Sequence, residues 1–244
     1  MIGSFKLQVG PLRLSCCSEQ ELLNEVSEYT TAKRGCIITY AHLHTLALAR
    51  EDGAVAETIN GCDICYCDGI GVSYVSILTN GHWLPKVTAN NFIDKLADLA
   101  LVHRFKIAII GGRPEAVSAA KEYFSQRGAL IVYSRDGYFN EAQGDSIIQE
   151  LVDIEPNLIL IGMGQDRQER FAFSLKQLLP RTVLFCVGGL FSFIAGEEWP
   201  CPIWMRKIGL EWTIRLASSP RRLWRRYLLE GPRLLLRAMV CRKL

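Results

Sequence analysis

Short apolar runs alternate with longer amphipathic stretches along most of the chain. The runs are dense in Val, Ile and Leu without polar alternation, which is typical of strands buried on both faces. They lie at Cys36–Tyr40, Asp63–Cys67, Lys106–Ile110, Leu130–Tyr133, Leu158–Ile161 and Val183–Val187. Between them, apolar residues recur three and four positions apart, as in helices with one buried face. These helices are expected at Glu19–Ala32, Asn91–His103, Glu115–Gln126, Glu141–Ile154 and Gln168–Leu178.

Alternating strands and helices predict an α/β fold, a Rossmann-like, mostly parallel sheet with helices on both faces. The chain has 244 residues, enough for one large domain or for a domain with an appendage. A break in composition near Pro200–Pro202 favours the second arrangement. We therefore predict an α/β domain over residues 1–200 and a C-terminal appendage over residues 201–244.

The appendage is strongly basic. It carries eleven Lys and Arg residues against Glu211 and Glu230, a net charge of +9 in a chain whose total is +3. Three tryptophans and Tyr227 are interleaved with these cations. A segment that is both cationic and apolar suits an anionic membrane surface. Nucleic acid is the less favoured partner, because no recognised nucleic-acid motif accompanies the basic residues.

Part of the appendage has a helical pattern. Ser219-Pro220 is a suitable N-cap and first helical residue, and Gly231-Pro232 is a suitable end. At about 100° per residue, arginines and apolar residues fall on opposite sides of this helix. The arginines are Arg221, Arg222, Arg225 and Arg226, and the apolar residues are Leu223, Trp224, Tyr227 and Leu228. A core-packed helix with a solvated arginine face is the ordinary alternative, but the one-signed charge favours membrane docking.

The nine cysteines are expected to be reduced and buried, because most lie inside apolar segments of a chain without a secretion signal. Cys62, Cys65 and Cys67 form a CxxCxC pattern. A metal or redox site would need a second pair at suitable spacing, and the sequence offers none. We therefore predict core thiols, no metal and no cofactor.

Glycines and polar residues gather where the predicted strands end, which is where parallel sheets bind ligands. These segments are Thr39–His42, Asp68–Gly71, Gly111–Pro114, Gly162–Gln165 and Gly188-Gly189. Gly111-Gly112 precedes a helix opened by Pro114, so free backbone N–H groups and the helix dipole could hold a phosphate there. A tight strand-to-helix turn is the alternative. A dinucleotide-dependent oxidoreductase is disfavoured, because no GxGxxG follows the early strands.

Several motifs, in order and over most of the chain, resemble those of the WecG/TagA/CpsF glycosyltransferases. The run Gly209–Leu216, followed by Pro220, Arg222, Arg225, Arg226 and Tyr227, resembles the family's closing signature. Asp68–Val72 resembles its Asp-Gly-x-Gly-Val element. Gly162–Gly164 and Arg167–Glu169 resemble its Gly-x-Gly-x-Pro-Arg/Lys-Gln-Glu element. Val187–Gly189 and Gly196 match later glycines.

The resemblance implies an inverting, metal-independent transfer of a sugar from a UDP-sugar to a sugar carried on polyprenyl diphosphate. Such reactions build exopolysaccharides, capsules and teichoic acids. The chain would then be cytoplasmic and peripheral on the inner face of the cytoplasmic membrane, and able to form a homo-oligomer. The sequence independently lacks an Asp-x-Asp that would hold a divalent ion on the donor.

The family's functional positions carry over onto named residues. Asp68, at a predicted strand end, becomes the candidate base, with a helix N-cap as its alternative role. Gln168 and Glu169 would line the pocket, although Glu169 also suits the first turn of a helix. The guanidinium groups of Arg215, Arg222 and Arg225 suit contacts with a diphosphate. The other candidates for binding substrate are Thr39, His42, Asn90, Asn91, Gly111 and Gly112.

The sequence departs from the family pattern at several of these places. His42 stands where an Asn is usual, Asp166 where a Pro is usual, and Ser192 where an Asp is usual. Ala89 and Asn91 replace a Gly and an Asp, and Pro200-Cys201 replaces an Arg-Ala. These changes leave the donor sugar open. They also keep a second hypothesis alive, a degenerate, membrane-associated scaffold subunit of a polysaccharide-assembly complex.

Overall fold

The computed structural model describes residues 5–197, 199, 201–202, 204–205 and 209–241. Within these residues, an eight-stranded sheet has the order β1-β2-β4-β3-β8-β7-β5-β6. Its strands are β1 (Lys6–Val9), β2 (Leu12–Ser15), β3 (Cys36–Ala41), β4 (Ile64–Cys67), β5 (Lys106–Gly111), β6 (Leu130–Arg135), β7 (Leu158–Gly162) and β8 (Val183–Cys186). Only the pairing of β1 with β2 is antiparallel among these strands. The predicted mostly parallel α/β fold is confirmed.

All six predicted strands are present, as β3 to β8. The hairpin of β1 and β2 was not predicted. Each of its strands is four residues long, and Gly10 turns the chain between them with φ 57°. Its apolar residues, such as Leu12 and Leu14, alternate with polar ones because one face is buried and the other is not. So short an alternation is a weak signal on its own.

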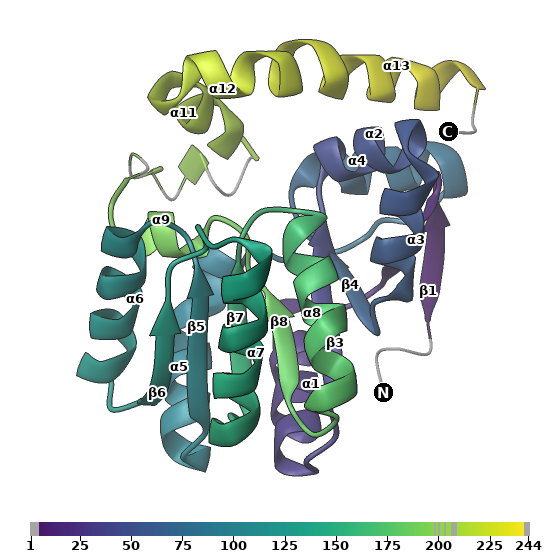
Figure 1. Cartoon of the computed structure of the whole chain (residues 1–244). Coiled ribbons are helices and arrows are strands. Elements are labelled where there is room, and N and C mark those ends of the chain that lie inside the picture. The colour runs from purple at the N-terminus through teal and green to yellow at the C-terminus, as the bar shows by residue number, and fades with distance from the viewer. Residues whose placement is uncertain (1–4, 198, 200, 203, 206–208, 242–244) are drawn as a thin grey trace.

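Helices cover both faces of the sheet (Figure 1). The five predicted helices are α1 (Glu19–Thr31), α5 (Ala89–His103), α6 (Pro114–Gln126), α7 (Glu141–Ile154) and α8 (Arg167–Leu178). Four further helices precede the C-terminal segment: α2 (Leu43–Glu51), α3 (Gly53–Gly61), α4 (Ile70–Asn80) and α9 (Leu190–Ile194). The antiparallel hairpin, α2, α3 and α4 together enclose a separate apolar cluster.

The strands are apolar on both sides because each side faces a different cluster. Ile38 and Ile109 pack with helices α1, α5 and α6 on one face of the sheet. Ile37 and Ile110 pack with α7 and α8 on the other. Residues adjacent in a strand point to opposite faces, so an unbroken apolar run is what this layering requires.

The C-terminal segment crosses above the carboxyl ends of the strands (Figure 1). Its helices are α11 (Glu211–Ser218), α12 (Pro220–Trp224) and α13 (Gly231–Cys241), with a π-helical turn, η2 (Arg225–Glu230), between the last two. Pro220 occupies the first position of α12, as predicted. Leu234 and Ala238 of α13 are buried in the cluster formed by α2, α4 and the hairpin. The division into a domain and an appendage stays a prediction, but this helix shares the domain's core.

Two expectations about the C-terminal segment are wrong. Gly231-Pro232 does not end the helix: Gly231 has helical φ and ψ of −57° and −54°, and α13 begins there. A π turn is wider than an α turn, so it leaves room for a proline that lacks an N–H and crowds the preceding carbonyl. The same turn changes the angular spacing, so arginines and apolar residues do not separate cleanly. Leu223 and Tyr227, expected on the apolar side, line the same cavity as Arg225 and Arg226.

Burial separates the cysteines of the CxxCxC pattern. Cys65 and Cys67 point into the apolar cluster beside the hairpin, and Cys62 points into the cluster under α8. Burial raises the pKa of Cys67 to about 12, so its thiol stays protonated. These side chains therefore behave as small core residues.

Candidate functional site

A cavity of about 650 Å³ lies beyond the carboxyl ends of the central strands. One wall includes the segments that follow β3, β4, β5, β6, β7 and β8, and the other consists of α11, α12 and η2. The C-terminal residues on the cavity are Arg215, Leu223, Arg225, Arg226, Tyr227 and Glu230. The sequence therefore brings its basic segment and its polar strand ends to one place.

Asp68 follows β4 directly and lines the cavity. Its backbone N–H donates to the Ala41 carbonyl (2.8 Å), and its Oδ1 accepts from Thr88 Oγ1 (3.1 Å). The N-cap of the next helix is Gly69, with φ 93°, so Asp68 does not have the capping role that the sequence left open. Burial raises the pKa of Asp68, while the charge of Arg215 and the Thr88 hydrogen bond act to lower it.

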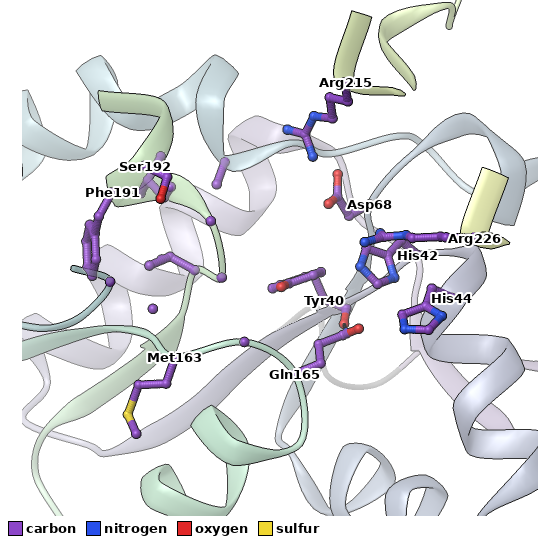
Figure 2. A pocket seen from close by; sticks show the side chains of 18 of the residues that line it. Tyr40, His42, His44, Asp68, Met163, Gln165, Phe191, Ser192, Arg215 and Arg226 are labelled. Carbon is purple, nitrogen blue, oxygen red and sulfur yellow. Dashed lines mark hydrogen bonds between the residues drawn. The ribbon is translucent and has the colours of Figure 1, made fainter. Parts of the chain in front are cut away.

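Two arginines from the opposite wall approach this carboxylate. The Arg215 side chain points from α11 toward Asp68, and the Arg226 guanidinium lies beside His42 (Figure 2). Both positive charges favour the ionised form of Asp68. Guanidinium groups beside a carboxylate in a partly closed cavity can hold phosphate oxygens at the point where a proton is removed.

His42 lines the cavity as the N-cap of α2. Its Nδ1 accepts from the Thr45 N–H (3.1 Å), which leaves the proton of the neutral ring on Nε2. Burial, followed by the charge of Arg226, lowers the pKa of His42 well below its usual value. The ring is therefore a neutral hydrogen-bond donor at physiological pH, where an Asn amide was expected from the family pattern.

Gln165 connects two of the loops that form the sheet side of the cavity. It donates through Nε2 to the Tyr40 carbonyl (2.8 Å) and accepts at Oε1 from Thr45 Oγ1 (2.6 Å). The neighbouring Asp166 has φ 69°, a left-handed conformation. Proline is locked near φ −65°, so the Pro of the family pattern could not occupy this backbone. Asp166, which replaces the usual Pro, therefore has a backbone conformation that Pro could not adopt.

Glycines form the other end of the cavity. A side chain on Gly188 would clash with the Tyr40 hydroxyl, and one on Gly111 would clash with the Gly162 backbone. Gly112 lines the cavity and Gly111 does not. The Gly112 N–H donates to the Gly162 carbonyl (2.8 Å), so it is not free for phosphate, as the sequence had suggested. The Gly112 N–H group instead forms a hydrogen bond within the protein, next to the strand-to-helix turn.

Three residues expected to contact substrate are buried behind the cavity wall. Thr39, Gln168 and Glu169 are fully buried and lie outside the cavity lining. Glu169 Oε1 accepts from Thr39 Oγ1 (2.5 Å) and Gln168 Nε2 (2.8 Å), and Gln168 Oε1 accepts from the Gly188 N–H (3.1 Å). Burial raises the pKa of Glu169. Their geometry suits support of the Gly188 turn and not direct contact.

Of the remaining predicted substrate-binding residues, some line the cavity and others do not. Asn90 and Arg225 line the cavity, whereas Asn91 lies in a smaller adjoining pocket with Thr88 and Arg215. The side chain of Arg222 is outside the part that the structure describes. The sequence prediction missed Tyr40, Gln165 and Arg226. Each had a signal: Tyr40 and Gln165 lie in the strand-end segments, and Arg226 belongs to the closing signature and the arginine cluster.

Among the described residues, no three or more His, Cys, Asp or Glu side chains lie together in a group that could hold a metal ion. In the same residues, no helix combines the length and the apolar character needed to cross a bilayer.

The parallel sheet and the cavity at its carboxyl edge, with a carboxylate facing arginines, define an α/β enzyme suited to an anionic ligand. The model of the glycosyl transferase WecG/TagA/CpsF family matches residues 7–244, and the chain belongs to this family. This confirms the resemblance seen in the motifs.

Curated relatives have a common name, N-acetylglucosaminyldiphosphoundecaprenol N-acetyl-beta-D-mannosaminyltransferase. The protein from Bacillus subtilis (strain 168) is 24% identical over 202 residues, 82% of this chain and 78% of the relative. The protein from Staphylococcus aureus (strain MW2) is 25% identical over 189 residues, 78% of this chain and 71% of the relative. The chain is thus similar to transferases over most of its length.

Proposed function

We propose that this glycosyltransferase moves a sugar from a UDP-sugar to a sugar linked to polyprenyl diphosphate, with inversion, during synthesis of a cell-surface polysaccharide. The main support for this proposal is that Asp68 faces Arg215 and Arg226 across one cavity. The names of the relatives support a lipid-linked acceptor that bears N-acetylglucosamine.

In the proposed reaction, Asp68 accepts the proton of the acceptor hydroxyl as its oxygen attacks the anomeric carbon of the donor. The bond from that carbon to the UDP oxygen breaks in the same step, which inverts the configuration. The leaving diphosphate carries the electron pair, and Arg215, Arg225 and Arg226 stabilise its charge. Burial of Asp68 strengthens the base, because it raises the pKa while the arginines keep the group ionisable.

Docking on an anionic membrane is part of the proposal. Leu228, Leu236 and Val240 are exposed apolar residues of the C-terminal segment, and Arg233 and Arg237 are exposed cations. Apolar side chains beside exposed arginines suit the boundary between lipid headgroups and acyl chains. Such docking would bring the cavity close to a polyprenyl-linked acceptor. Sedimentation with phosphatidylglycerol vesicles at low salt tests it, with phosphatidylcholine vesicles as the control.

The central experiment is transfer from a panel of UDP-sugars to N-acetylglucosaminyl-diphosphoundecaprenol, followed by mass spectrometry of the lipid product. UDP-N-acetylmannosamine heads the panel because of the relatives' names. The proposal expects a product one sugar heavier with one donor, and none with the Asp68→Asn variant. UDP binding without transfer across the panel would favour the scaffold hypothesis instead.

A further inference from the structure

The C-terminal segment contains two acidic residues, and each one bonds to the body of the protein. Glu211 of α11 pairs with Lys86 (2.5 Å), and Glu230 at the end of η2 pairs with His44 on α2 (2.7 Å). Residues 201–244 otherwise carry only positive charges. The two carboxylates thus lie near the arginines that face the cavity, Glu211 one turn before Arg215 and Glu230 one turn after Arg226.

Apolar burial is weaker in these two elements than in α13. Neither α11 nor η2 contains a buried residue, in contrast to α13, which buries Leu234 and Ala238. The Lys86 and Glu211 side chains are only 19% and 21% exposed. An ion pair so shielded from water is screened less than a surface pair, so it can fix the orientation of a short helix.

Lys86 is itself fixed relative to the candidate base. The N–H of the next residue, Val87, donates to the Cys67 carbonyl (2.8 Å) at the end of β4. Thr88 then donates to Asp68 (3.1 Å). A single short loop therefore contacts Asp68 at one end and the helix of Arg215 at the other.

From these contacts we infer that Glu211 and Glu230 are positioning residues: the ion pair of Glu211 with Lys86 and the hydrogen bond between Glu230 and His44 hold Arg215 and Arg226 over Asp68. The inference deepens the proposed function and rests on it for its catalytic meaning. Its structural part, the anchoring of α11 by Lys86, stands apart from any reaction.

Direct electrostatics is the competing explanation for Glu211, whose negative charge also favours the protonated form of Asp68. The two explanations predict different results for the Glu211→Gln and Lys86→Gln variants. If Glu211 acts as an anchor, Glu211→Gln and Lys86→Gln both disorder α11 and both impair catalysis. If Glu211 acts only through its charge, Glu211→Gln shifts the acid limb of the pH profile to lower pH, and Lys86→Gln does not reproduce this.

The experiment compares Lys86→Gln, Glu211→Gln and the exchanged pair Lys86→Glu with Glu211→Lys. Lys176→Gln is the matched control, because Lys176 forms a half-buried pair with Asp63 (2.7 Å) and neither residue lines the cavity. Hydrogen exchange of the α11 amides and the Kd for UDP are measured first. We expect faster exchange in the two single variants alone, and a Kd about 10-fold higher, the effect of one lost charge-assisted contact.

Turnover is then measured with the active donor. A shift of about 1 Å in a positioning group can cost about 10²-fold, so we expect kcat/KM to fall by about 10- to 100-fold in both single variants. The exchanged pair should recover most of this loss. Unchanged exchange in α11, or no recovery in the exchanged pair, would overturn the inference. A wild-type protein that binds no UDP would instead overturn the proposed function. Hydrogen exchange in α11 would still show whether the Lys86–Glu211 ion pair anchors this helix.

Discussion

The two walls of the cavity differ in how they are held together. The sheet wall follows strands whose residues are almost all buried. Its Gln165 side chain forms hydrogen bonds with Tyr40 and Thr45, and behind the wall Glu169 of α8 accepts from Thr39 of β3. The C-terminal wall consists of short helical pieces. Its α11 and η2 contain no buried residue, and they contact the body through the ion pair of Glu211 with Lys86 and the hydrogen bond between Glu230 and His44.

This difference separates the proposed base from its proposed cations. Asp68 follows a strand held by apolar burial, which is not screened by salt. The arginines depend on charge and on the buried residues Leu223, Leu234 and Ala238 of α12 and α13. We therefore expect added salt to weaken UDP binding more than it weakens the fold.

The largest expected effect is on the sheet wall. Asp68→Asn keeps the size of the side chain but removes the base, so kcat should fall by about 10²- to 10⁴-fold. The Kd for UDP should rise little or even fall, since a negative charge beside the phosphates is lost. Initial rates with a saturating donor and calorimetry with UDP provide the two values. Activity within a few-fold of wild type would refute the assignment.

The next effect concerns the apolar anchor of the C-terminal wall. Leu234 is 4% exposed, so Leu234→Ala should cost about 2–5 kcal/mol of unfolding free energy. Leu236 on the same helix is 57% exposed, and its Ala variant should change stability by no more than about 0.5 kcal/mol. Urea unfolding followed by fluorescence compares them. Equal costs would mean that α13 is not packed as the structure has it.

A smaller effect is expected for a single cation of the cavity. Arg226→Ala should raise the Kd for UDP by about 10- to 100-fold, the effect of losing one charged hydrogen bond. Arg237→Ala removes an exposed arginine outside the cavity lining and should leave UDP binding unchanged. Titration of both variants with UDP at low salt tests this. Similar losses in the two would point to a general charge effect and not to a site.

The smallest effect should appear in the pH dependence of stability. Burial raises the pKa of Glu169 above its usual value, so the folded state holds the proton more tightly than the unfolded state. Its contribution is then fully present below the unfolded pKa and is lost as pH rises through the higher, folded pKa. Glu169→Gln removes this titration and should flatten the fall in stability above pH 4.5. Urea midpoints between pH 4 and pH 8 reveal the slope, and an unchanged slope would contradict the expectation.

The fold class could be predicted from the sequence because burial on both faces leaves an unbroken apolar run, as in Ile107–Ile110 and Leu158–Ile161. Asp68 and Arg215 could be named as site residues because local motifs carry them. The hairpin of β1 and β2 could not be predicted from the sequence, because four-residue strands become stable only when they pair.

The sequence by itself determined the six strands from β3 to β8, the five long helices that cover them, and the placing of Asp68 at a strand end. Only the tertiary structure decided which side of each element faces the cavity. It turned Glu169 inward, brought Arg226 to His42, and continued the last helix through Gly231-Pro232 by means of a π turn. The physical reason is that orientation depends on contacts between distant segments, such as Lys86 with Glu211, which no local pattern encodes.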